Sequence, residues 1–410
     1  MSRPRYLGVL AGLGLVGSII SPTLAQTRTF TLTGDFDDGS LAKLNNVQVK
    51  PETAVPDGRV VLGPTAVSKT RLVWVSNTSP GGTSPGWIVR IDTTTGKQTA
   101  RFDSALISIN GQPTGAPTTY NLPGRVAVDA NGDVWIINRA YSGTTQGSLS
   151  KFSGDISHCI DRNNNGVIDT SRDANGDGIV DPLKKYGSVP DNEAEYYGQA
   201  DECILTTIKI GAPGAIPRAV AVDKRGKIWV GTYNGSTVYR FNPNEPVALE
   251  AQRTFNTSSG WPVTENFYSA ATGDDFVYFV GRQGDVVQIN INDSNIKNGS
   301  FVNARRAGCL TSGYAYGIVA VPGTQQVWVG GYSGSGLYKI DFAPATPTCT
   351  WKAMGGQITA MTLDLNGNIW ASGYSSGYVY KLDQNMNVLA TCASSGTRPH
   401  GLSVDFDGNI

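Results

Sequence analysis

Residues 220–229 of the chain read Val-Ala-Val-Asp-Lys-Arg-Gly-Lys-Ile-Trp, and the same pattern occurs at residues 126–135 and 361–370. Each copy has a short apolar alternation, then Asp-x-x-Gly, one variable residue, an apolar residue and a tryptophan. A fourth copy starts at residue 402 and is cut short at residue 410, before its tryptophan. A motif that recurs every few tens of residues indicates a fold built from repeated supersecondary units.

Each copy predicts a tight turn between two β-strands. The aspartate side chain caps such a turn, and the glycine adopts the positive φ that the turn requires. Alternating segments at residues 237–241 and 378–382 predict a third strand, and residues 388–392 predict a fourth, outer strand. Four strands in a repeat of this length are typical of a β-propeller blade. The alternative is a solenoid of strands and helices, but no segment shows a convincing helical period.

Less regular copies of the motif place further anchor residues at Trp74, Tyr278 and Trp328. With the tryptophans of the three complete copies they define six blades, and the interrupted copy begins a seventh. We therefore expect an all-β protein in which residues 65–410 form a seven-bladed propeller whose last blade is truncated. Either the chain is a truncated gene product, or N-terminal strands at residues 29–33 and 41–50 complete the ring.

Residues 1–25 have the pattern of a secretory signal peptide. Arg3 and Arg5 precede an apolar run at residues 7–20, and Ala25 is a small residue at a plausible cleavage point. The run is too short to span a bilayer, and no later segment is long and apolar enough to do so. We expect a mature protein that is secreted, periplasmic or attached to the cell surface, with N-terminal strands and a linker at residues 26–64.

The overall composition excludes one class of partner. Lys+Arg and Asp+Glu are equal, at 33 each, so the chain has no excess of positive charge with which to bind nucleic acid. Five cysteines in an exported protein allow two disulfide bonds and leave one thiol.

The repeats resemble those of streptogramin B lyase and of NHL-repeat propellers, in which a Pro-x-Gly opening precedes the motif. The closest openings here are residues 399–402 and 217–220. In the lyase a glutamate commonly follows the Trp strand, and histidine and glutamate residues bind a divalent ion and carry out the elimination. The matching positions in this chain hold no acid: they are Asn77, Asn138, Thr232, Gly281, Gly331 and Gly373. His400 is the one weak catalytic candidate near the channel.

One residue further along, the repeats carry larger side chains. These positions hold Thr78, Arg139, Tyr233, Arg282, Tyr332 and Tyr374. Equivalent loop positions of a propeller lie in a ring on one face, so we expect a ligand-binding face where tyrosines stack on a flat or sugar-like group and arginines pair an anion. The alternative is that these side chains only pack loop against loop. Arg218, Tyr316 and His400 open first strands near the channel, with the same two alternatives.

Residues 155–203 form an acidic insertion in the second blade, with eleven acidic and four basic residues. Two segments in it follow the pattern Asp-x-Asx-x-Asx-Gly-x-x-Asp, in which oxygens at positions 1, 3, 5 and 7 converge on a hard cation. We expect Ca²⁺ to be bound there. Arg172 and Lys184 replace the glutamate of an EF-hand, so the loops resemble those of dockerin and thrombospondin type 3 repeats. The predicted ligands are Asp161, Asn163, Asn165, Val167 and Asp169 in the first loop, and Asp173, Asn175, Asp177, Ile179 and Asp181 in the second. Either Asp169 or Asp173 completes the first site, and either Asp181 or Glu193 the second.

Cys159 and Cys203 lie at the two ends of this insertion. We predict a disulfide bond between them, which would hold the ends of a long polar loop together. Two of Cys309, Cys349 and Cys392 could pair across neighbouring blades, and the sequence leaves that choice open.

Taken together, these features favour an exported, non-catalytic propeller that binds a protein, a glycan or a small molecule on one face. The insertion would be stabilised by calcium and by the disulfide bond. The alternative is a divalent-metal-dependent lyase or lactonase of the streptogramin B lyase-like type. A ring of acidic residues around the channel would favour the enzyme, and the loops supply none.

Overall fold

The computed structural model describes residues 47–49, 60–62, 71–78, 86–117, 119, 121–244, 246–260, 264–296, 299–303, 314–333, 336–394, 398–404 and 410. The chain divides into two units, residues 1–66 and 67–410. In the first unit, β1 (Val47–Val49) pairs antiparallel with β2 (Val60–Leu62), and β1 falls within the strand expected at residues 41–50. The predicted signal peptide lies outside the described residues. No helix of the described ranges is long and apolar enough to cross a membrane.

The described part of the second unit contains six propeller sheets, which we number as blades 1 to 6. Blade 1 has three strands, and each of the others has four, in chain order. The strands are β3 (Leu72–Asn77), β4 (Trp87–Asp92) and β5 (Gln98–Asp103); β8 (Pro123–Val128), β9 (Val134–Asn138), β10 (Ser148–Phe152) and β11 (Ile204–Lys209); β12 (Pro217–Val222), β13 (Ile228–Thr232), β14 (Thr237–Asn242) and β15 (Ala248–Thr254); β16 (Phe267–Thr272), β17 (Phe276–Gly281), β18 (Asp285–Asn290) and β19 (Gly299–Asn303); β20 (Ala315–Ala320), β21 (Gln326–Gly331), β22 (Gly336–Asp341) and β23 (Thr348–Ala353); and β24 (Ile358–Leu363), β25 (Ile369–Gly373), β26 (Tyr378–Leu382) and β27 (Val388–Ala393). A two-stranded hairpin, β6 (Ser108–Ile109) and β7 (Gln112–Pro113), connects blades 1 and 2.

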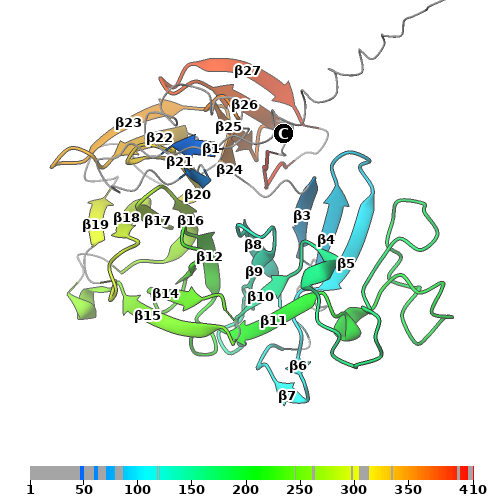
Figure 1. Cartoon of the computed structure of the whole chain (residues 1–410). Helices are drawn as coiled ribbons and strands as arrows, with labels where there is room; N and C mark the ends of the chain where they lie inside the picture. Colours follow the sequence, from blue (N-terminus) through cyan, green and yellow to red (C-terminus); the bar gives the residue numbers. More distant parts are fainter. Residues whose placement is uncertain are drawn as a thin grey trace, which may run out of the picture. The chain divides into compact units, whose positions relative to one another are not determined.

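The first strands of successive blades contact one another, β8 with β12, β12 with β16, β16 with β20 and β20 with β24. Figure 1 shows these strands toward the middle of the unit, with β11, β15, β19, β23 and β27 at its outside. Each buried apolar cluster lies between two neighbouring blades. Between blades 1 and 2, for example, the rings of Trp74, Phe102 and Phe152 lie 5.6 to 6.3 Å apart. The hydrophobic core is therefore a series of interfaces between blades, as the repeat predicts.

The repeated aspartate joins the turn to the tryptophan strand. In blade 6, Asp364 accepts hydrogen bonds from the backbone N–H groups of Asn366 and Asn368 and from Trp370 Nε1, at 2.9, 2.9 and 3.1 Å. Asp129 and Asp223 bind the indoles of blades 2 and 3 in the same way. A lysine or arginine of the third strand lies over each of these indoles. One carboxylate thus fixes the hairpin turn and the rotamer of a fully or partly buried tryptophan.

The described residues do not contain the predicted seventh blade. The structure describes six blades, and residues 405–409, which hold the turn of the expected seventh, lie outside the described residues. Residues 402–404 are described and are not in a strand. The segment just before them does lie beside blade 6, since Thr359 Oγ1 donates a hydrogen bond of 3.1 Å to the carbonyl of Pro399.

Candidate functional site

The first strand of every four-stranded blade has a β-bulge near its start. Pairing with the second strand shifts register around Arg125 in β8, Arg218 in β12, Tyr268 in β16, Tyr316 in β20 and Thr359 in β24. A bulge re-aims the side chain of its extra residue. His400 follows Pro399 as Arg218 follows Pro217, and its ring contacts the ring of Tyr316. We call Arg125, Arg218, Tyr268, Tyr316, Thr359 and His400 the inner ring.

The residues after the second strands form a second set at the same ends of the sheets. In five blades the backbone N–H of this residue donates to the carbonyl of the residue just before the first strand, at 2.6 to 3.1 Å. This bond joins the end of the second strand to the beginning of the first. We call these residues, together with Thr78 after β3 of blade 1, the outer ring: Thr78, Arg139, Tyr233, Arg282, Tyr332 and Tyr374. Five of them are the residues predicted for the binding face.

Tyr316 lies at the centre of the inner ring. Arg125 Nη2 donates to its backbone carbonyl at 3.3 Å, and Arg218 Nη2 donates to its hydroxyl at 3.1 Å. The hydroxyl also forms a hydrogen bond of 2.7 Å with His400 Nε2. The ring of Tyr268 packs edge-on against Tyr316, with ring centroids 4.7 Å apart. Side chains from blades 2, 3, 4 and 5 and from the segment after blade 6 therefore meet at one tyrosine.

Aromatic contacts connect the two rings. Tyr233 lies 5.9 Å from Tyr268, and Tyr332 lies 5.4 Å from Tyr316 and 6.0 Å from Tyr374. Arg282 Nη1 donates to the Tyr233 hydroxyl at 2.6 Å. The predicted outer-ring residues are thus brought together with a second layer of side chains. Sequence analysis singled out three members of that layer and missed Arg125, Tyr268 and Thr359.

The inner ring is electropositive. Loss of hydration and, to a smaller extent, the nearby Arg218 together lower the pKa of Arg125 to about 10, against the opposing effect of Tyr316. Loss of hydration also lowers the pKa of Arg139, again with help from Arg218. For His400 the same burial effect, together with the guanidinium groups of Arg125, Arg218 and Arg139, lowers the pKa to about 4 although part of its surface is open to solvent. The imidazole is therefore neutral at pH 7. Its Nε2 accepts the hydrogen bond from Tyr316 in the tautomer that carries the hydrogen on Nδ1.

The positions that match the metal-binding region of the lyase have structural roles here. Asn138 is fully buried, and its Nδ2 donates to the carbonyl of Ser104 and to the hydroxyls of Ser148 and Ser150. Thr232 is also fully buried, and its hydroxyl bonds the backbone of Thr237. These side chains bond neighbouring strands within the blades.

In the first loop of the insertion, four of the predicted ligands converge. The backbone N–H groups of Asn165 and Gly166 donate to the Asp161 carboxylate at 3.2 and 2.9 Å. The side-chain amides of Asn163 and Asn165 donate to Asp169 Oδ2 at 2.7 and 3.1 Å. The Oδ1 atoms of the same two amides accept the backbone N–H groups of Asn165 and Val167 at 2.9 and 2.8 Å. Carboxylate, amide and carbonyl oxygens of this kind are the ligands that a hard cation prefers.

The second loop repeats this backbone pattern. Gly176 and Gly178 donate their N–H groups to Asp173 at 2.9 and 2.8 Å, and Asn175 Nδ2 lies 2.9 Å from Asp177 Oδ2. The pKa of Asp177 is lowered, chiefly by the hydrogen bond from the backbone N–H of Ile179. No group of three or more His, Cys, Asp or Glu side chains within the described ranges could hold a metal, so amide and carbonyl oxygens would have to supply part of either site.

Two buried glutamates that sequence analysis did not predict support the loops from behind. Glu202 Oε2 accepts the N–H of Asp169 at 2.9 Å, and Glu195 Oε2 accepts the N–H of Asp181 at 2.8 Å. Each thus binds the ninth residue of one loop. Nothing in the local pattern distinguishes them from the other acids of the insertion, because they lie 33 and 14 residues away from the amides they bind.

The predicted disulfide bond between Cys159 and Cys203 is confirmed, with the two Cα atoms 4.5 Å apart. Cys349 is disulfide-bonded as well, and Cys392 is a free, exposed thiol. Cys309 lies outside the described residues.

The insertion leaves blade 2 and docks against the outer strand of blade 1. Gln98 donates its N–H to the carbonyl of Gly178 at 3.0 Å and accepts the N–H of Val180 on its side chain at 3.2 Å. Lys97 Nζ donates to the carbonyl of Gly176 at 2.7 Å. The second loop is therefore part of an interface between blades.

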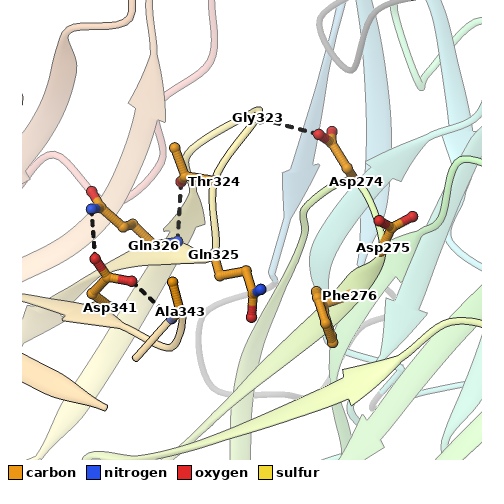
Figure 2. Close-up of a pocket in the computed structure, with 9 residues that line it drawn as sticks. All are labelled: Asp274, Asp275, Phe276, Gly323, Thr324, Gln325, Gln326, Asp341 and Ala343. Atoms are coloured by element: carbon orange, nitrogen blue, oxygen red, sulfur yellow. Dashed lines mark hydrogen bonds between the residues drawn. The ribbon is translucent and has the colours of Figure 1, made fainter. Parts of the chain in front are cut away.

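A hollow of about 360 Å³ lies at the opposite end of the strands, between the first turns of blades 4 and 5. Figure 2 shows that several of its polar side chains already have hydrogen-bond partners among the lining residues, within blade 5 and across the two blades. Asp341 accepts Gln326 Nε2 and the N–H of Ala343, both at 2.9 Å, and Asp274 accepts the N–H of Gly323 at 3.2 Å. We therefore place the candidate site at the two rings and not in this hollow.

Comparison with known proteins identifies the fold. A family model described as a two-component regulator propeller matches residues 211–234, which contain β12 and β13. No curated protein matches the sequence significantly. The structure of a streptogramin B lyase is similar over 84% of this chain and 90% of that chain, with a TM-score of 0.51 and 13% sequence identity. A catalytically inactive variant of virginiamycin B lyase from Staphylococcus aureus, solved with quinupristin, gives 0.49 and 12% over 82% and 93% of the two chains. At this identity the likeness is one of fold, and the chain is a β-propeller with an architecture similar to that of streptogramin B lyase.

Proposed function

We propose that the protein is an exported binding module whose ligand site is formed by the inner and outer rings. The observation that carries the proposal is the convergence of tyrosine, arginine and histidine side chains on Tyr316, from blades 2 to 5 and from the segment after blade 6. Aromatic faces beside guanidinium groups are suited to ligands that combine a ring with polar or charged substituents. Tyr233, Tyr332 and Tyr374 are only half-buried, which leaves ring surface for such a ligand.

We take the site to bind its ligand without chemical conversion. An elimination or lactone hydrolysis needs a positioned base and a group or metal ion that stabilises developing negative charge. The lyase-like positions carry Asn, Thr and Gly. The Asn138 side chain bonds Ser148 and Ser150 of its own blade and the carbonyl of Ser104, and Thr232 bonds Thr237 of its own blade. This argument favours binding over the alternative of a metal-dependent lyase or lactonase.

Saturation-transfer NMR tests the binding proposal with a panel of neutral pyranosides, acidic sugars, aromatic acids and aromatic amines. Some members should give a signal that disappears when Tyr332 and Tyr374 are both changed to alanine. The matched control is Trp351→Ala, which removes an aromatic side chain, 47% exposed, from the outer strand of blade 5. The proposal is contradicted if no ligand signal is lost in the double variant, or if the same signals are lost in the Trp351→Ala control.

We also propose that the two loops of the insertion bind Ca²⁺ and so stabilise it. Asp161, Asn163, Asn165, the carbonyl of Val167 and Asp169 would hold one ion, and Asp173, Asn175, Asp177, the carbonyl of Ile179 and Asp181 a second. Loops of this kind in extracellular modules have dissociation constants of about 10⁻⁴ to 10⁻³ M. Calorimetry should record calcium binding that is lost in the double variant Asp161→Ala, Asp173→Ala. Heats that are absent in the native protein, or unchanged in the variant, exclude the assignment.

Export is part of the proposal. The Cys159–Cys203 bond would persist in an oxidising compartment, and the first 25 residues have the order of a signal peptide. N-terminal sequencing of protein recovered from the periplasm or medium should start near residue 26. Recovery of the intact N-terminus from the cytoplasm alone excludes it.

A further inference from the structure

Two arginines of the inner ring and one of the outer ring concentrate positive charge at the site. Besides burial, Arg218 and Arg139 lower the pKa of Arg125, and Arg218 lowers the pKa of Arg139. The hydrogen bonds of all three arginines go to hydroxyls or backbone carbonyls. Within the described residues, none of the three forms an ion pair with a carboxylate. Positive groups that lower one another's pKa also repel one another, so the binding of an anion among them would be electrostatically favourable.

Arg218 shows where such an anion would bind. Its residue is only 6% exposed, and its Nε has no hydrogen-bond partner. The guanidinium lies 3.7 Å from the ring centroid of Tyr268, and its Nη2 bonds the Tyr316 hydroxyl. A buried, charged N–H group without an acceptor is costly, and more so than a neutral one. The stacking on Tyr268 holds the group in place, so the vacant donor is preorganised for an acceptor.

The outer ring indicates what the anion is attached to. Tyr332 and Tyr374 are half-buried tyrosines. Tyr332 contacts Tyr316, which bonds Arg218, and Tyr374 contacts His400, with centroids 5.4 and 5.7 Å apart. Aromatic faces add contact area only for a ligand that carries a ring beside its charge. A small inorganic anion would use the arginines and leave these faces unused. A planar carboxylate matches the fork of a guanidinium group, and a pyranose presents an apolar C–H face to tyrosine.

We propose that the inner ring binds the carboxylate of an acidic sugar of the uronate class, whose ring stacks on the outer-ring tyrosines. The proposal rests on the ligand-binding function proposed above and specifies its ligand. Arg218 is the principal carboxylate-binding residue, and Arg125 and Arg139 add charge. When neutral His400 accepts the hydrogen bond from the Tyr316 hydroxyl, the hydroxyl oxygen accepts from Arg218 Nη2. The hydroxyl hydrogen is then engaged by His400 and does not donate to the anion.

Binding of glucuronate tests the proposal directly, because glucuronamide is almost the same shape and has no charge. NMR titration at low ionic strength should show glucuronate binding at least ten times more tightly than glucuronamide. Arg218→Gln should reduce glucuronate affinity at least tenfold and abolish the difference between the two sugars. Arg218→Lys should restore part of it, since the charge remains but the fork is lost. Lys352→Gln on the outer strand β23 removes the same charge and should change nothing.

Three results overturn the proposal. They are equal binding of glucuronate and glucuronamide, binding of inorganic sulfate as tight as that of glucuronate, and unchanged glucuronate binding by a folded Arg218→Gln protein. Thermal unfolding establishes whether that variant is folded. If it is not, Arg139→Gln takes its place, since this residue follows β9 and lies outside the strand pairing. Neutral sugars that bind through Tyr332 and Tyr374 while uronates do not would leave the proposed function intact and refute the uronate alone.

Discussion

The Asp364→Asn substitution tests the physical basis of the repeat in one blade. Asp364 Oδ2 accepts Trp370 Nε1 at 3.1 Å and Asn368 Nδ2 at 3.0 Å, and it pairs with Lys381 Nζ at 3.0 Å. The substituted amide keeps Oδ1 for the backbone N–H groups of the turn. It places an NH₂ group where three donors converge, so the hairpin survives and the tryptophan and lysine lose their acceptor.

The size of the effect follows from these contacts. A hydrogen bond to a charged acceptor contributes about 1.5–3 kcal/mol, and its loss leaves the Trp370 N–H unsatisfied. The ion pair adds about 0.5–1 kcal/mol, because Lys381 is one-quarter exposed and partly screened. We therefore expect the free energy of unfolding to fall by roughly 2–4 kcal/mol.

Asp383 in the same blade supplies a matched control. It accepts the N–H groups of Asn385 and Asn387 and the side-chain amide of Asn387, at 2.8 to 2.9 Å, as Asp364 does in its own turn. Among the described residues, neither a tryptophan nor a lysine donates a hydrogen bond to it. Asp383→Asn should therefore cost less than about 1 kcal/mol, the range of a surface change away from buried networks.

Urea unfolding followed by circular dichroism measures both variants, alone and in a Trp370→Phe background. Removal of the indole donor should reduce the cost of Asp364→Asn by about 1 kcal/mol or more, since the unsatisfied donor is gone. The loss of stability at acid pH is a second test of the same contacts. Burial alone would raise the pKa of Asp364, but hydrogen bonds from Asn368, Trp370 and Lys381 outweigh it and lower the pKa. The stabilisation is therefore present above the unfolded pKa near 4 and is lost as the pH falls below it. Equal costs for Asp364→Asn and Asp383→Asn would refute the reasoning.

Four further perturbations have defined outcomes. Gly147→Ala should destabilise the protein by about 1–3 kcal/mol, because the added Cβ would lie 2.2 Å from Pro217 Cδ, whereas Gly143→Ala has open space and should be near neutral in thermal unfolding; equal effects would contradict the packing. The NMR titration midpoint of His400 should lie near 4 and rise in Arg218→Gln as a positive neighbour is removed, and a midpoint near 6.5 in the native protein would show that the arginines exert no such influence. Chelation of calcium should speed hydrogen exchange at the amides of Gln98 and Val180, where the insertion meets blade 1. Unchanged exchange would show that calcium binding in the loops does not stabilise that interface. Incubation with a streptogramin B antibiotic and magnesium should yield no linear product by mass spectrometry, and turnover abolished by His400→Ala would make the rings an active site.

The blades could be predicted from sequence because each short-range signal agrees with the fold. The segments at residues 237–241 and 378–382 were expected as third strands. β26 has the expected bounds, and β14 extends one residue further, to Asn242. The turn, the aspartate cap and the tryptophan strand all lie within ten residues of one another. Local chemistry therefore determines them before any contact between blades forms.

The inner ring was only partly predictable, because a bulge leaves no constant spacing in the sequence. Arg125 precedes its anchor by 10 residues, Arg218 by 11 and Tyr316 by 12. Extra residues in the bulge and in the following turn shift the position from blade to blade. The docking of the insertion on blade 1 was not predicted at all, since its contacts join residues about 80 apart, such as Lys97 and Gly176. No local pattern encodes such a pairing.

The bulges separate the tasks of folding and recognition. A bulged residue lies outside the regular ladder of the first strand, so its side chain is not needed to set register or to fill the interface between blades. Arginine, tyrosine and threonine occupy equivalent bulges of this one molecule with the same strand pairing around them. The propeller thus offers a set of interchangeable positions around one axis. An engineer could exchange these side chains one blade at a time to select ligands of different charge, with the hairpins and their tryptophans left untouched.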